Sequence, residues 1–118
     1  MKHTISSFFA STLLLLASTL DAQTKCILPA PDGGIENVSN RNLAGHISRI
    51  QSDFLEVREY KTRQLVKVRI TKSEVAYSAY GGDELVSKLK SGVAVRIWYK
   101  NCRVSASGNA VAAYIESR

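Results

Sequence analysis

Five side chains of this sequence have the types and spacing that could bind an anion or a ring. They are four basic residues and a tryptophan that alternate with apolar neighbours: Arg58, Lys67, Arg69, Arg96 and Trp98. Basic groups attract phosphate or sulfate, and an aromatic ring can stack on a base or a sugar. Any solvated sheet face shows the same alternation of charged and apolar residues. The pattern therefore predicts either a ligand surface or an ordinary solvated face.

Catalytic groups are sparse by comparison. General acid-base or nucleophilic catalysis needs several reactive side chains placed together. After residue 3 the chain has one histidine, His46, and no Ser or Cys stands in a recognisable nucleophile setting. The neighbouring carboxylates Asp83 and Glu84 open a segment expected to be helical, where capping and the helix dipole explain them. We expect a binding protein rather than an enzyme, with no cofactor and no metal.

The two cysteines and the N-terminus suggest export. Residues 1–22 carry a basic start, an apolar stretch around Leu13–Leu16 and small residues up to Ala22, the order of a cleavable signal peptide. The apolar core of this stretch is far shorter than the roughly 20 residues that span a bilayer, and no later segment is apolar enough to do so. In an oxidising compartment we expect Cys26 and Cys102 to form a disulfide, since their spacing fits no metal motif. The expected location is secreted or periplasmic.

The net charge favours anionic partners. The chain has 16 Lys and Arg against 10 Asp and Glu, a formal charge of +6. Cleavage after Ala22 would remove one basic and one acidic residue, Lys2 and Asp21, and leave that charge unchanged. Such a surface suits nucleic acid, acidic glycans, lipopolysaccharide or an acidic protein. Many exported proteins are basic without such a partner, so charge alone selects none of them.

The elements that must position these residues are mostly strands. Residues 23–42 contain Pro, Gly, Asn and Ser without periodicity and are predicted to form an irregular arm. From Leu43 to residue 118 the pattern has period two and predicts one domain of five strands, the first running to Ile50 with a bulge after Ile47. Residues 82–92 depart from it: Leu85, Val86 and Leu89 fit the inner side of a short helix that ends at a glycine. The order of three strands, a helix and two strands predicts an all-β, five-stranded Greek-key OB-fold barrel with one short helix between strands three and four.

The hairpin of the second and third strands has a predicted register. A turn at residues 61–64 pairs Leu55 with Ile70 and Val57 with Val68, which keeps all four inside. It also places two like charges, Arg58 and Lys67, opposite each other on the outer face. In OB-folds the outer face of these two strands, with the loops between strands one and two and between strands four and five, is the usual ligand surface.

The C-terminal part resembles a known family. The features that carry the resemblance are the early Cys26, the helix end Leu89–Gly92, the strand Val93–Tyr99 before Cys102 and the closing strand Ala110–Glu116. In these features the chain resembles the B subunits of heat-labile-enterotoxin-like and subtilase-cytotoxin-like toxins. The resemblance implies an OB-fold that forms pentamers, binds cell-surface glycans and carries a catalytic A subunit.

The chain also departs from that family. Its expected helix is much shorter than that of the enterotoxin subunits, and Arg103 and Val104 follow Cys102 where those subunits have a nearby Trp. No glycan-binding residue can be transferred from the family. The same order of elements is similar to that of small periplasmic bacterial OB-fold proteins, which usually lack the disulfide.

We therefore expect an exported, non-enzymatic OB-fold module that binds a glycan, an anionic polymer or a protein partner through its barrel side. A toxin-like subunit would form a homo-oligomeric ring, whereas a periplasmic protein of stress or envelope function would be a monomer or dimer. A secreted OB-fold nuclease is the competing class, and it would need clustered carboxylates, a metal and an arginine near the barrel mouth.

Overall fold

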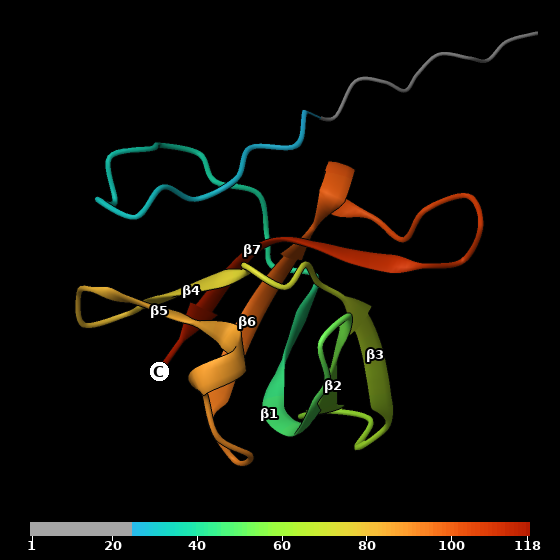
Figure 1. Cartoon of the computed structure of the whole chain (residues 1–118). Coiled ribbons are helices and arrows are strands. Elements are labelled where there is room, and N and C mark those ends of the chain that lie inside the picture. The colour runs from blue at the N-terminus through green and yellow to red at the C-terminus, as the bar shows by residue number, and fades with distance from the viewer. Residues whose placement is uncertain (1–24) are drawn as a thin grey trace, which may run out of the picture.

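A computed structural model describes residues 25–118, so the expected signal peptide lies outside the described residues. This part of the chain contains seven strands: β1 Leu43–Ile50, β2 Phe54–Glu59, β3 Leu65–Arg69, β4 Val75–Ser78, β5 Asp83–Leu85, β6 Ala94–Tyr99 and β7 Ala110–Ser117. Two short 3₁₀ turns are the only helical elements among these residues, η2 Val86–Lys88 and η3 Lys100–Cys102. Residues 25–42 contain neither helix nor strand and lie at the end of the barrel that carries the β6–β7 connection (Figure 1).

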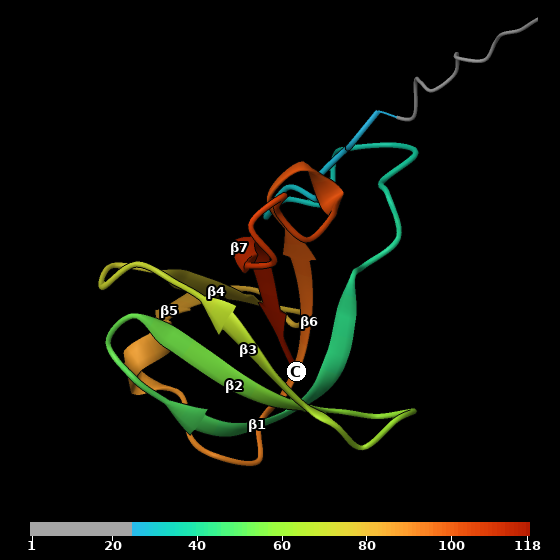
Figure 2. The ribbon, with the colours of Figure 1, turned by 90° about the vertical axis from the view of Figure 1, so that its right-hand side faces the viewer.

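The strands close into an OB-like barrel. The antiparallel order runs from β3 through β2, β1 and β6 to β7, and a parallel pairing of β3 with β7 joins the two ends. Figure 2 shows β1, β2 and β3 side by side along one flank of this barrel. The β4–β5 hairpin extends the sheet from β7 on the other side. The all-β, five-strand barrel predicted from the period-two pattern is thus confirmed.

The barrel interior is filled by the apolar side chains of the alternating pattern. Its most deeply buried members come from β1, β2, β3, β6, β7 and η2: Ile47, Leu55, Val57, Val68, Val86, Val95, Ile97 and Ile115. On β3, Lys67 and Arg69 are exposed on either side of the buried Val68, so the inner and outer faces are as predicted. A slip by one residue would have reversed them.

Two irregularities in pairing redirect side chains. The register of β1 against β2 shifts between Ile47 and Arg49, as the sequence predicted for this strand. A second shift between Trp98 and Tyr99 on β6 was not predicted. It breaks the simple alternation expected along β7, where Ala110 and Ile115 both belong to the core despite their odd spacing.

The predicted helix at residues 82–92 is wrong. The segment instead forms the short strand β5 and the turn η2, and Leu85, expected to face inward, is exposed. Gly81 and Gly82, with φ of 102° and 88°, turn the chain back so that β5 pairs with β4. A helix of only eleven residues is marginally stable because its nucleation costs free energy, whereas pairing with β4 gives this segment backbone hydrogen bonds. Only Val86 is fully buried, in the barrel core.

The predicted register of the β2–β3 hairpin is also wrong, by two residues. Leu55 lies opposite Val68 and Val57 opposite Val66. The turn spans residues 60–64 because the Glu59 carboxylate accepts hydrogen bonds from the backbone of Lys61 and Thr62. Moving the centre of the turn by one residue shifts the pairing by two and preserves the faces.

The like-charge pair expected on this hairpin does not form. Arg58 lies opposite Leu65, and Lys67 lies opposite Glu56. Opposite charges facing each other across a strand pair stabilise the sheet, whereas like charges would destabilise it.

Candidate ligand-binding face

The side chains that point away from the core on β1, β2 and β3 form a surface that we call the outer face. The pairing arranges them in three rows: His46–Arg58–Leu65, Arg49–Glu56–Lys67 and Phe54–Arg69. Five of these eight are basic or histidine, and Glu56 is the single acid. This is the sheet surface that OB-folds commonly use for binding.

Phe54 carries two cations over its ring. The ammonium nitrogen of Lys67 lies 4.4 Å from the ring centroid, and the guanidinium carbon of Arg49 lies 5.5 Å from it. Attraction between a cation and an aromatic face holds the two charges near each other. Arg49 also approaches the carboxylate of Glu56 at 3.7 Å, so Lys67 is the charge of this group without an ion pair in the described structure.

A hollow of about 390 Å³ lies at the Phe54 end of the outer face. Its walls come from the β1–β2 connection and the start of β2, from β3, and from the β6–β7 connection and the start of β7: Asp53, Phe54, Lys67, Arg69, Gly108, Asn109 and Ala110. The parallel pairing of Val68 with Ala110 brings the β6–β7 connection beside β3. The closure of the barrel thus assembles a hollow that no single segment could form.

The β6–β7 connection is ordered by its own hydrogen bonds. The backbone N–H of Ser105 donates to the carbonyl of Asn109 at 2.8 Å, and that of Gly108 donates to the carbonyl of Ser105 at the same distance. The hydroxyl of Ser105 accepts a further bond from the backbone of Asn109. These bonds fix Asn109 at the rim of the hollow before any ligand arrives.

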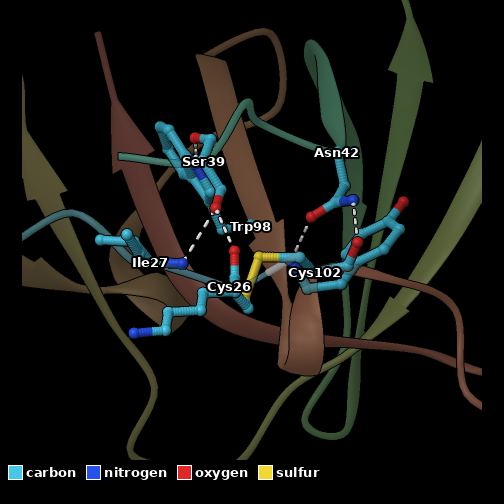
Figure 3. Close-up of a disulfide and its surroundings, with 8 residues drawn as sticks. Cys26, Ile27, Ser39, Asn42, Trp98 and Cys102 are labelled. Carbon is cyan, nitrogen blue, oxygen red and sulfur yellow. Dashed lines mark hydrogen bonds between the residues drawn. A yellow bond between two sulfur atoms is a disulfide. The ribbon is translucent and has the colours of Figure 1, made fainter. Parts of the chain in front are cut away.

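The predicted disulfide between Cys26 and Cys102 is present and joins the arm to the start of the same connection (Figure 3). Beside it, the Asn42 side chain donates to the carbonyl of Cys102 at 2.8 Å and accepts from the backbone N–H of Tyr99 at 2.8 Å. The arm is therefore fastened near both of its ends to the end of β6 and the start of the β6–β7 connection.

Trp98 and Arg96, which the sequence grouped with the ligand-binding residues, lie elsewhere. The Trp98 side chain is covered by the arm, only 6% exposed, and its Nε1–H donates to the carbonyl of Ser39 at 2.7 Å (Figure 3). Its ring meets Tyr114 edge-on at 5.6 Å. Arg96 lies 3.7 Å from the carboxylate of Glu116. Trp98 thus holds the arm, and Arg96 pairs with β7. Neither residue lines the hollow that contains Lys67 and Arg69.

Arg58 is on the outer face but at its far end, near the tip of the β2–β3 hairpin. A hollow of about 300 Å³ lies there, lined by His46, Arg58, Glu59, Tyr60 and Arg63. Of the predicted set, the structure therefore brings Lys67 and Arg69 together and places Arg58 at a separate position on the same face.

Three partners of the site were missed from the sequence. Phe54 and Glu56 share the parity of Arg58, so the alternation could have revealed Phe54 as an outward residue. Arg49 reaches the outer face only because of the bulge in β1. Asn109 belongs to a distant loop, and only the β3–β7 closure brings it near.

The titratable groups with altered pKa values serve the fold. Burial raises the pKa of Tyr99 and of Tyr114, so both phenols stay neutral. Hydrogen bonds from Thr62 and Lys61 lower the pKa of Glu59. No group of three or more His, Cys, Asp or Glu residues suited to a metal occurs among residues 25–118. None of the helical elements in that range is long and apolar enough to cross a membrane.

Comparison with known proteins offers no relative for this chain. No family model matches it, and neither a curated protein nor a solved structure does. The outer face must therefore be interpreted from its own geometry and charge.

Proposed function

We propose that this protein is an exported, non-enzymatic binding module whose outer face binds an acidic glycan, a polysaccharide that carries carboxylate or sulfate groups. The observation that carries the proposal is the hollow beside Phe54. There Lys67 and Arg69 converge with Asn109 between two loops, at the position that OB-folds commonly use, and outnumber the single carboxylate of the hollow, Asp53. Ammonium and guanidinium groups pair with carboxylate and sulfate, and arginine can do so through two parallel hydrogen bonds.

Two observations favour a glycan over a nucleic acid. A disulfide between Cys26 and Cys102 suits an oxidising compartment outside the cytosol, where acidic glycans are common polyanions. The ring of Phe54 already lies under Lys67 and Arg49, so its faces are less available for base stacking than in proteins that bind single strands. Charge and shape, rather than stacking, would then provide most of the affinity.

A toxin-subunit-like receptor-binding role is a narrower form of the same proposal. It would add a symmetric ring of identical chains, since such modules gain avidity from several sites acting together. The mass of the protein in solution tests this form: a ring would support it, and a monomer would leave only the single-module form.

The test is heparin binding, measured by calorimetry, for the wild type and the variant Lys67→Ser/Arg69→Ser. We expect the variant to bind about tenfold or more weakly, a loss of about 1.4 kcal/mol or more. The matched control is Lys88→Ser/Lys90→Ser, which removes the same charge from two exposed positions that line neither of the two hollows on the outer face. It should change affinity by less than about threefold, because exposed charges that do not contact the ligand act on it only through the screened field of the protein.

Other outcomes would overturn the proposal. Equal weakening in both variants would mean that net charge alone attracts heparin. Binding of neutral dextran as tightly as heparin would exclude an anion site. A single-stranded oligonucleotide of matched charge that displaces heparin at a much lower concentration would assign the face to nucleic acid.

A further inference from the structure

The tip of the β2–β3 hairpin holds a second cluster of side chains that can bind an anion, with two arginines and a histidine. His46 of β1 and Arg58 of β2 are cross-strand partners, and Arg63 lies in the adjoining turn. Together with Tyr60 and Glu59 they line the hollow of about 300 Å³. The side chains of these residues converge on the hollow from two strands and a turn.

The Arg58 side chain and the Arg63 backbone are held in place by hydrogen bonds. Nη1 of Arg58 donates to the backbone carbonyl of Arg63 at 2.7 Å, a contact that uses one nitrogen of the guanidinium. Arg63 has a φ of 64°, and its backbone N–H donates to the carbonyl of Glu59 at 2.9 Å. A guanidinium held by one bond loses less freedom when it grips an anion with its other donors.

The one carboxylate at the tip is committed to the turn. Oε1 of Glu59 accepts from the backbone N–H and the hydroxyl of Thr62, at 3.0 and 2.8 Å, and Oε2 accepts from the backbone N–H of Lys61 at 3.1 Å. These bonds satisfy both oxygens and draw them toward the backbone of the turn. Glu59 therefore orders the loop that carries Arg63 and opposes a bound anion less than an unpaired carboxylate would.

An aromatic wall completes the hollow. The rings of His46 and Tyr60 meet edge-on, with centroids 4.8 Å apart, and the Tyr60 backbone donates to the carbonyl of Ala44 at 3.1 Å. Tyr60 is 46% exposed, as is Leu65 at the end of the same row. Aromatic rings beside arginine side chains suit a ligand made of rings that carry negative groups.

The two hollows lie at opposite ends of one strand. Phe54 and Arg58 are four residues apart on β2, which corresponds to about 13 Å along the strand. Between them lies the row of Arg49, Glu56 and Lys67, in which the ion pair of Arg49 with Glu56 leaves the charge of Lys67 in excess. The outer face is thus a basic path between the hollows.

We infer that the hollow at the hairpin tip is a second anion subsite, and that the ligand is a glycan chain long enough to occupy both hollows at once. This inference rests on the proposed function and makes it more specific, because a monosaccharide or a free anion cannot span the two positions. The subsite near Phe54 takes one charged sugar, and the tip takes another farther along the same chain. Linking the two contacts makes the second binding event intramolecular and raises the affinity.

The test compares heparin fragments of increasing length on the wild type and on the tip variant Arg58→Gln/Arg63→Asn. Asparagine tolerates the positive φ of residue 63, so the turn can be kept. We expect affinity of the wild type to rise with fragment length until both hollows are filled. The tip variant should bind long fragments about tenfold more weakly than the wild type and short fragments within about twofold, while Lys88→Ser/Lys90→Ser follows the wild type at every length.

A second measurement needs no substitution. The imidazole signals of His46 in the NMR spectrum of the wild type should shift on addition of long fragments and stay in place with fragments too short to leave the Phe54 hollow. Affinity independent of length, with the tip variant unaffected and His46 unmoved, would overturn the second subsite and leave the proposed function intact. Absence of heparin binding at every length would overturn the proposed function itself.

Discussion

Replacing Gly45 with alanine should destabilise the barrel because no side chain fits at this position. Gly45 lies on β1 between Glu59 of β2 and Val95 of β6 and is buried. A Cβ atom added there would lie 2.1 Å from the carbonyl oxygen of Arg58 and 2.9 Å from a methyl carbon of Val57. To reach an ordinary contact of 3.4 Å, the carbonyl would have to move by about 1.3 Å. The obstacle is backbone within a ladder of hydrogen bonds, so it cannot move freely.

The cost follows from two opposing effects. Overpacking in a closely packed interior costs about 1–3 kcal/mol, and a rigid backbone obstacle favours the upper end. The lower entropy of alanine in the unfolded chain returns about 0.4–1 kcal/mol. We expect Gly45→Ala to lower the free energy of unfolding by about 2 kcal/mol, which corresponds to a fall in Tm of roughly 8–16 °C for a domain of this size.

Urea denaturation followed by the fluorescence of the single tryptophan, Trp98, measures this change. Ser48→Ala, an exposed position on the same strand, is the control and should stay within about 0.5 kcal/mol of the wild type. A Gly45→Ala protein as stable as its control would refute the close approach of β1 and β2 described here. It would also put in doubt the spacing of the rows on the outer face.

Three further predictions concern the arm and the hairpin turn. Replacing Cys26 and Cys102 together with serine should lower stability by about 4.5 kcal/mol, the chain-entropy value for their separation of 76 residues, and urea denaturation of the wild type with reductant should show the same loss. Trp98→Phe removes the fluorescent reporter, so its urea denaturation is followed by circular dichroism; it should cost about 1–2 kcal/mol because the carbonyl of Ser39 loses its donor, and an unchanged midpoint would contradict that role. Folding lowers the pKa of the Glu59 carboxylate from its ordinary value of 4.5, so its contribution to stability is full above that pH and is lost as the pH falls through the folded value. Between pH 6 and pH 3 the wild type should therefore lose more free energy of unfolding than Glu59→Gln does. Equal acid losses would show that the turn does not depend on this charge.

The barrel could be predicted from the sequence because its interior follows one rule. Where alternate residues are apolar, as at Leu55 and Val57 or Val95 and Ile97, the inward face is determined and the strand assignment follows. The disulfide also followed directly, since Cys26 and Cys102 are the only cysteines of the chain.

The predictions of the helix and of the hairpin register were wrong because the local sequence patterns there fit more than one structure. Leu85 and Leu89 stand at helical spacing, but pairing with β4 depends on a turn at Gly81 and Gly82 that the helical pattern does not encode. The hairpin register depended on Glu59, whose carboxylate shifts the centre of the turn one residue earlier than the turn predicted at residues 61–64.

Only part of the candidate site could be predicted from the sequence. Lys67 and Arg69 were found because they alternate along one strand, whereas Asn109 joins them through the long-range pairing of β3 with β7. Trp98 has the parity of an outward residue, and nothing in its own strand shows that the arm covers it. Contacts between distant segments decide which outward residues remain free to bind.

The most direct test of the account is to map the heparin contact by the backbone amide signals of the isotope-labelled protein. The account predicts that the largest shifts fall at Phe54, Lys67, Arg69 and Asn109, while the amides of Lys88 and Lys90 stay in place. Raising the salt concentration should reverse these shifts, because the binding releases counterions. Largest shifts on the β4–β5 hairpin or along the arm would contradict the assignment of the outer face as the binding surface.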